Sequence, residues 1–128
     1  MPGILCSVYD PADRTVEPKW RRGLELVQHH PEHVLEQYDE PGFHLACLYH
    51  PEVCKGPRIL VTEHYVLACY GNVYEDHLAS VSDSESFCQA LLGRFLKHGV
   101  DGLQHLNGRY DITVWDRHDR VLHFVSDR

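Results

Sequence analysis

The chain lacks three features, and each absence excludes a class of protein. No apolar run approaches the roughly 20 residues that a membrane-spanning helix needs. Lys and Arg together number 12 against 19 Asp and Glu, a net charge of -7, so no basic stripe is available to neutralise nucleic-acid phosphates. The opening residues, Met1-Pro2-Gly3-Ile4, do not have the composition of a secretory signal.

Paired cysteine motifs are also absent. The chain has five cysteines, an odd number, and no two have the C-x-x-C spacing: Cys6, Cys47, Cys54, Cys69 and Cys88. Most lie in apolar segments, where a free cysteine packs as a small hydrophobic residue. The sequence therefore predicts free thiols and a reducing, cytoplasmic location.

The overall composition is that of an ordinary globular protein. The chain has 128 residues, of which 43% are hydrophobic and 24% charged. This length predicts a single domain, residues 1–128, that buries roughly two-thirds of the surface of its unfolded chain. No G-x-S-x-G motif, phosphate-binding glycine loop or paired catalytic carboxylates occur.

Eleven histidines leave a metal-binding module as an alternative function. His29, His30 and His33 have the spacing H-H-x-x-H, but Pro31 between them disturbs the helical geometry that would bring two of them to one zinc ion. A second, weaker ligand set is His50, Glu52 and Cys54. We expect these histidines to pack or to contact solvent, and we predict no metal or other cofactor.

Short apolar runs bounded by turn residues predict β-strands. The predicted strands are Gly3–Tyr9, Phe43–Tyr49, Arg58–Thr62 and Tyr65–Tyr70. Pro41-Gly42 predicts a turn before the second of them. Residues 73–81 are expected to be mostly loop with one helical turn.

Two segments have apolar residues at helical spacing. The first extends from Trp20 to about His29, and Pro31 is expected to end it and to begin a second short helical turn. The second is Ser84–His98, followed by Gly99, a typical C-terminal stop. Residues 100–105 predict a further helical turn.

The C-terminal segment Leu106–Arg128 predicts a β-hairpin with strands Tyr110–Trp115 and Val121–Val125. Apolar residues alternate with other residues along the first strand, so we expect one of its faces to lie on a core. That face should pack against the helix side chains Phe87, Leu91 and Phe95. Strands and helices without regular βαβ alternation predict the α+β class.

Four motifs occur in a recognisable order: Met1–Ile4 (MPGI), Gly71–Glu75 (GNVYE), Ser82–Glu85 (SDSE), and L-N-G at Leu106 followed by a strand ending W-D-R. They resemble M-C-G-I, G-E-I-Y-N, S-D-T-E and the matching hairpin of the glutamine amidotransferase domain of the asparagine synthetase family. The resemblance covers the first residues and roughly Tyr65–Arg128. It implies an N-terminal-nucleophile (Ntn) hydrolase fold, a four-layer sandwich of two antiparallel β-sheets between helices. Family members continue past Arg128 with further strands and an ATP-dependent domain, so we expect either a fragment or a naturally short chain, truncated at its C-terminus.

The residues that the resemblance places in the glutamine site are mostly changed. In the family, an N-terminal cysteine attacks the glutamine amide with its own amine as base, but Pro2 stands at that position. The oxyanion-hole asparagine is replaced by Tyr70, although Gly71 is retained. Phe43–Tyr49 contains no arginine to hold the glutamine carboxylate, whereas Asp83 matches the acid that holds the amine. The resemblance therefore implies vestigial glutamine-binding residues, Gly71 and Asp83, and no catalytic residue.

These positions also have ordinary structural interpretations. Asp83 would suit the start of a helix, and Gly71 would suit a turn. Cys6 cannot replace the nucleophile, because four residues along a strand span roughly 13 Å; we expect it to be buried in a first strand that includes Pro2. Loss of Met1 would leave Pro2 as a secondary amine, a base for which no substrate is specified.

The leading interpretation is a catalytically inactive amidotransferase-like domain. Its role would be structural or in interaction, beside an ATP-dependent amide-forming domain like those of asparagine and β-lactam synthetases. The alternative is an active or glutamine-binding domain with altered chemistry. No S-G-G-x-D-S pattern for ATP occurs, so synthetase activity is not expected in these residues. An open sheet edge at the C-terminal hairpin would also favour self-association.

Overall fold

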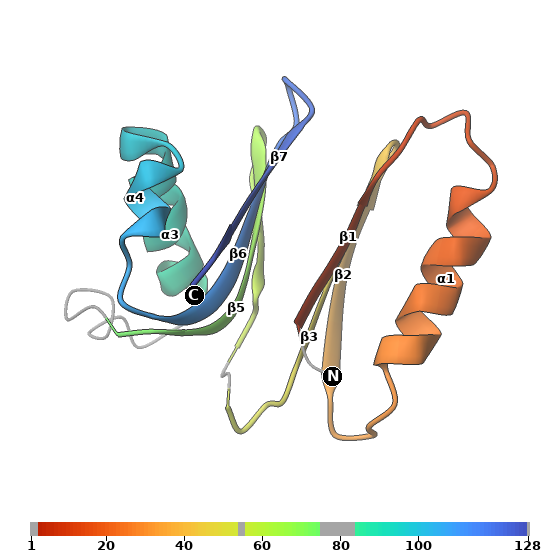
Figure 1. Cartoon of the computed structure of the whole chain (residues 1–128), viewed down its shortest axis with the longest axis horizontal. Helices are drawn as coiled ribbons and strands as arrows, with labels where there is room; N and C mark the ends of the chain where they lie inside the picture. Colours follow the sequence, from red (N-terminus) through yellow and green to blue (C-terminus); the bar gives the residue numbers. More distant parts are fainter. Residues whose placement is uncertain (1–2, 54–55, 75–83, 128) are drawn as a thin grey trace.

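The computed structural model describes residues 3–53, 56–74 and 84–127. These residues form two antiparallel β-sheets that face each other, with helices on the outer face of each sheet (Figure 1). The predicted α+β class, with two antiparallel sheets, is confirmed. No helix among the described residues is long and apolar enough to cross a membrane.

The first sheet has three strands in the order β1-β3-β2. They are β1 (Gly3–Val8), β2 (Val34–Glu40) and β3 (Phe43–Tyr49). All seven residues of β3 are buried, because one face lies under helix α1 and the other faces the second sheet. Such two-sided burial explains the continuous apolar run that predicted this strand. The predicted turn at Pro41-Gly42 joins β2 to β3.

The second sheet has four strands in the order β4-β5-β6-β7. They are β4 (Ile59–Val61), β5 (Tyr65–Val73), β6 (Gly108–Asp116) and β7 (Val121–Ser126). The predicted C-terminal hairpin is therefore confirmed, with Ile112 opposite Val125 and Trp115 opposite Leu122. Strand β5 extends to Val73; the predicted loop beyond it falls mainly outside the described residues.

The prediction of one core face on the hairpin strand was incomplete, because both faces of β6 are buried. Tyr110, Ile112 and Val114 belong to the core between this sheet and the helices. Trp115 belongs to the core between the sheets, where its ring stacks on Phe43 with 4.4 Å between ring centroids. Alternate residues of one strand thus fill two different cores.

Helices α3 (Ser84–His98) and α4 (Asp101–Gln104) cover the second sheet. Both were predicted, and Gly99 between them has a φ of +64°, the left-handed conformation expected after a helix. Leu91 and Phe95 are buried in the same core as Tyr110 and Ile112, with Phe87 packed against it. The predicted packing of the helix on the hairpin sheet is confirmed.

Helix α1 (Val16–Val27) covers the first sheet and begins four residues before the predicted start at Trp20. The buried ring of His44 from β3 holds it there. This ring stacks on Trp20 of the helix and on Tyr9, with centroid distances of 5.1 and 4.7 Å. Its Nδ1 lies 2.6 Å from a carboxylate oxygen of Asp39.

The predicted helical turn after Pro31 was wrong, because the chain forms β2 from Val34 onward. Val34, Leu35 and Tyr38 fit a helical spacing, but alternation along β2 sends Leu35 toward α1 and Tyr38 toward the second sheet. Pairing with all seven residues of β3 satisfies the backbone of this segment.

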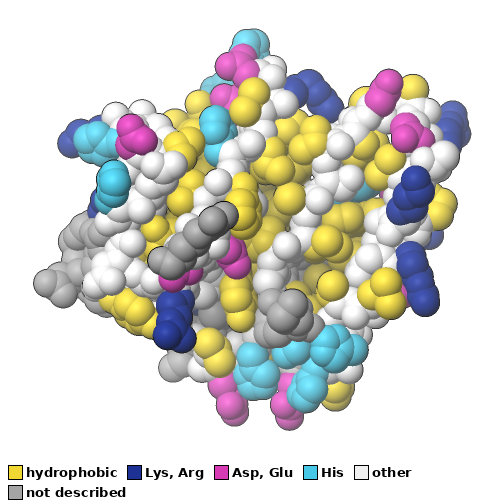
Figure 2. All heavy atoms as spheres, in the orientation of Figure 1, with side chains coloured by type: hydrophobic (Ala, Val, Ile, Leu, Met, Phe, Trp, Pro, Cys, Tyr) yellow, Lys and Arg dark blue, Asp and Glu magenta, His cyan; other side chains and the backbone are white. Residues whose placement is uncertain are grey.

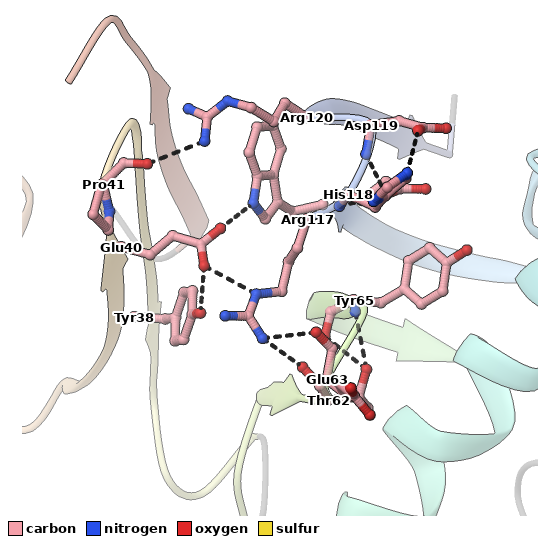
Figure 3. A network of polar contacts seen from close by, with 12 residues as sticks. Tyr38, Glu40, Pro41, Thr62, Glu63, Tyr65, Arg117, His118, Asp119 and Arg120 are labelled. Atoms are coloured by element: carbon pink, nitrogen blue, oxygen red, sulfur yellow. Dashed lines mark hydrogen bonds and ion pairs between the residues drawn. The ribbon is translucent and has the colours of Figure 1, made fainter.

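A polar network joins the two sheets at the end where β2 turns into β3 (Figure 3). The carboxylate of Glu40 accepts hydrogen bonds from the Trp115 indole, the Tyr38 hydroxyl and the Arg117 guanidinium. Arg117 also donates to the carbonyls of Thr62 and Glu63, at 3.0 and 2.9 Å. One carboxylate therefore connects β2 with the β6–β7 hairpin, and through Arg117 with the β4–β5 turn.

We expect Phe95→Ala to lower the free energy of unfolding by about 3 kcal/mol or more, as for other buried aromatic residues. Phe95 is 8% exposed and contacts the rings of Tyr65 and His123. Leu96→Ala is the matched control, because Leu96 is 57% exposed on the same helix. Chemical denaturation measures both; equal losses would contradict the packing described here.

The lowered pKa of Glu40 predicts that the protein loses stability in acid. Burial alone would raise the pKa of its carboxyl, but hydrogen bonds from Trp115, Tyr38 and Arg117 outweigh it and lower the pKa below the ordinary value of 4.5. The unfolded chain then binds the proton first, so this contribution is present above pH 4.5 and is lost as pH falls through the lower, folded-state pKa.

Denaturation at several pH values should show a shallower acid decline in Glu40→Gln than in the unsubstituted chain. Glu63→Gln serves as the control, because its side chain is 88% exposed. An unchanged acid decline in the Glu40 variant would refute the role of this carboxylate.

Candidate functional site

Gly71 lies within strand β5 and not in a turn, which corrects the ordinary interpretation of this residue. Its φ is +94°, and it pairs with Tyr110 of β6. A Cβ atom at this position would stand 2.1 Å from the carbonyl oxygen of Arg109. The neighbouring backbone therefore requires glycine here, whether or not a ligand binds.

The Gly71 segment lies at the end of the sandwich where β1 begins. Tyr70 packs against the buried pair Cys47 and Tyr49 of β3, together with Ile4 of β1. In the register of the first sheet, Ile4 lies opposite Cys47. The structure thus brings the start of the first strand and the retained glycine to one region. The other two positions of interest, Pro2 and Asp83, lie outside the described residues.

Glu36 is an acidic group at this end that was not predicted from the sequence. Its carboxylate accepts hydrogen bonds from the Tyr49 hydroxyl and from the backbone amides of Arg58 and Ile59, at 2.9–3.0 Å for the amides. Burial raises the pKa of Tyr49 well above its ordinary value, and the hydrogen bond to Glu36 raises it further. The phenol therefore stays protonated and cannot act as a base near neutral pH.

Arg58 is a buried cation near this end, and it too was not predicted. The residue is 7% exposed, and its guanidinium carbon lies 6.0 Å from the ring centroid of Phe87. Its side chain therefore extends toward α3, on the face of the sheet opposite to the Glu36 carboxylate. The Nε atom is shielded from solvent and has no hydrogen-bond partner among the described residues. The only sequence signal was its place at the start of an apolar run.

Cys6 occupies β1 as predicted, but the expectation that it is buried was wrong. Its side chain is partly exposed and packs at the edge of the inter-sheet core formed by Phe43, Leu45 and neighbouring residues. Because β1 is the outer strand of its sheet, no further strand among the described residues covers it. Partial burial raises the pKa of the thiol, which lowers its reactivity. Cys47, Cys69 and Cys88 are buried.

Four histidines gather where β2 begins and β3 ends. The ring of His33 lies 5.0 Å from that of His30, 6.1 Å from His50 and 6.2 Å from His29, between centroids. Glu32 lies beside two of them, with its carboxylate 3.4 Å from the Nε2 atom of His50. Across the described residues, no group of three or more His, Cys, Asp or Glu side chains is arranged to hold a metal ion. The proposed partner Cys54 lies outside those residues.

Two open hollows in the surface offer other places for a ligand. One of about 690 Å³ lies beside Asn107, Tyr110 and Asp127, but the Asp127 carboxylate already accepts the backbone amide of Tyr110. The other, of about 470 Å³, lies beside Arg117 and Arg120, at the end of the sandwich opposite to Gly71. Neither hollow places an arginine next to the Gly71 segment.

The lowered pKa of His33 predicts that the free energy of unfolding falls in mild acid. Its pKa lies below the ordinary value of 6.5, first because its ring is shielded from water and then because nearby histidines repel a positive charge. The unfolded chain then binds the proton first, so stability present above pH 6.5 is lost as pH falls from 6.5 toward the folded-state pKa. His33→Gln should weaken this dependence. His118→Gln, at a side chain 89% exposed, should leave it unchanged; equal pH dependence in all three proteins would refute the prediction.

The residues around Gly71 supply a glycine with positive φ, a protonated phenol and a carboxylate that accepts several hydrogen bonds. Asp111 and Arg109 of β6 lie opposite Tyr70 and Asn72. Comparison of the chain with models of known protein families gives no match, and a search of curated proteins finds none that is similar. The functional conclusion therefore depends on the motifs and on this geometry.

Proposed function

We propose that the chain is a catalytically inactive glutamine amidotransferase-like domain with an Ntn-hydrolase-type sandwich. Its role is structural or in interaction, beside an ATP-dependent amide-forming domain of the asparagine synthetase type. Four motifs in family order support the proposal. Two antiparallel sheets with helices on their outer faces are compatible with it.

The positions of the first strand and the Gly71 segment also support this proposal. An amidotransferase of this type needs its N-terminal residue close to a backbone oxyanion hole. The start of β1 and the Tyr70-Gly71 segment lie at one end of the sandwich, joined through the packing of Ile4, Cys47 and Tyr70. The parts of a glutaminase site would therefore meet here if the catalytic side chains were present.

The observation that carries the inactive assignment is that strand β3 has no arginine, although the resemblance places the carboxylate-binding arginine there. Binding the α-carboxylate of glutamine needs a cation, preferably an arginine that forms two parallel hydrogen bonds. Strand β3 contains no arginine and is buried along its whole length. In the first sheet this end carries an acid, Glu36, whereas the cation beside the Gly71 segment, Arg109, belongs to strand β6 of the second sheet. The buried cation Arg58 points to the other face of the second sheet, against Phe87.

We expect no ammonia release from glutamine above the buffer rate, and no heat of binding in a glutamine titration. Pro2 has no nucleophilic side chain, and the cation and the oxyanion asparagine are missing as well. A coupled assay for ammonia and isothermal titration calorimetry measure the two quantities. Binding without hydrolysis would replace the proposal with the alternative of a glutamine-binding domain.

Pro2→Cys alone should not restore hydrolysis, because two binding elements are still missing. The double variant Pro2→Cys and Tyr70→Asn should also be inactive, because β3 still has no arginine for the glutamine carboxylate; circular dichroism checks that both variants fold. Glutaminase activity in the single variant would show that the binding site is intact and would contradict the proposed loss of function.

A further inference from the structure

The two sheets have four edge strands, and two of them are protected against pairing with another chain. Strand β4 is only three residues long, and short edges pair poorly. Strand β2 carries Glu36, Asp39 and Glu40, and Glu36 binds the backbone of Arg58 and Ile59 next to β4. On this side of the sandwich, the β2 and β4 edges contact each other and are therefore less accessible to another chain.

The remaining edges, β1 and β7, lie on the opposite side and have no such protection. Their sequences are GILCSV and VLHFVS, without Pro, Lys, Arg, Asp or Glu. Among the described residues, neither strand has a neighbour on its outer side. Figure 2 shows hydrophobic side chains at the surface between these strands. Val8 of β1 is 50% exposed, and Phe124 of β7 is 59% exposed.

The outward backbone groups of β7 can be assigned from its pairing with β6. The amide of Asp127 donates to the carbonyl of Tyr110. Since the direction alternates along an antiparallel strand, Val121, His123 and Val125 also direct their backbone groups to β6. Leu122, Phe124 and Ser126 therefore direct their N–H and C=O groups away from the sheet. Among the residues that the structure describes, these groups have no backbone partner, and they lie beside the exposed ring of Phe124.

We propose that β7 pairs antiparallel with β7 of a second copy of this chain, about a two-fold axis at Phe124. An antiparallel edge is complementary to itself, as an interface with two-fold symmetry requires. In this register, Phe124 faces Phe124 of the copy, Leu122 faces Ser126, and His123 faces Val125. The pairing extends the four-stranded sheet across both copies and removes two phenylalanine rings from water.

Charge favours this edge as the contact between copies. Each chain has a net charge of -7, so a contact between copies must avoid acidic surface. Between Asp119 and Asp127, the chain has no acidic residue. Within Val121–Ser126, the proposed register brings no ionised side chain opposite one of the same sign. The inference does not depend on the proposed function.

Sedimentation velocity of the 128-residue protein over a wide concentration range tests the proposal. We expect a reversible monomer–dimer equilibrium. Phe124→Lys should weaken dimerisation by at least about a hundredfold, because two apolar rings per dimer lose their burial and two charges meet. The fold should persist, since Phe124 is exposed in the monomer. Circular dichroism checks this.

Two matched variants identify the edge. Leu96→Lys replaces an exposed apolar residue on α3, and Val8→Lys replaces one on the β1 edge; both should leave the dimer intact. A monomer at every concentration, a dimer that survives Phe124→Lys, or one that Val8→Lys or Leu96→Lys disrupts equally would overturn the proposal.

Amide hydrogen exchange gives an independent measurement. The amides of Leu122, Phe124 and Ser126 should become more protected as concentration rises. Those of Val121, His123 and Val125 already pair with β6 and should not change. Equal concentration dependence in the two sets would contradict the assigned direction of the backbone groups.

Discussion

Two carboxylates of one strand hold the two sheets together. Glu36 and Glu40 both point from β2 toward the second sheet, and each accepts several hydrogen bonds from it. Both side chains are partly buried, and a carboxylate shielded from water without hydrogen-bond partners would disfavour folding. The spacing between the sheets, the position of β4 and the place of the Trp115 ring therefore depend on these two groups finding their donors.

The same arrangement limits the chemistry at the end near Gly71. The Glu36 carboxylate already accepts hydrogen bonds from a phenol and two backbone amides, so the protein itself occupies most of its acceptor sites. The interaction that stabilises this end of the sandwich therefore leaves this carboxylate few sites for a ligand.

The elements with unambiguous local patterns were predictable from the sequence. Strand β3 and helix α3 were predicted with their observed bounds, because an apolar run and an i, i+4, i+8 spacing each have one good interpretation. Strand β2 was missed because its inward face is acidic and its few apolar residues fit a helix.

The candidate site was less predictable for a similar reason. The role of Glu36 depends on the amides of Arg58 and Ile59, which are 22 and 23 residues away. No local pattern could indicate these partners. Gly71 was identified from its motif, but the close approach of Arg109 that requires it exists only after β5 and β6 have paired.

Gly71 also shows why a glycine that fits a motif need not indicate an activity. An alanine at this position would collide with the backbone of β6 and would have to adopt a left-handed conformation. Folding alone is thus sufficient to keep this glycine, even in a chain that hydrolyses nothing. Its presence in other sequences of this type would be poor evidence of an active enzyme. Residues without a folding role, such as a nucleophile or a carboxylate-binding arginine, are the better markers of retained catalysis.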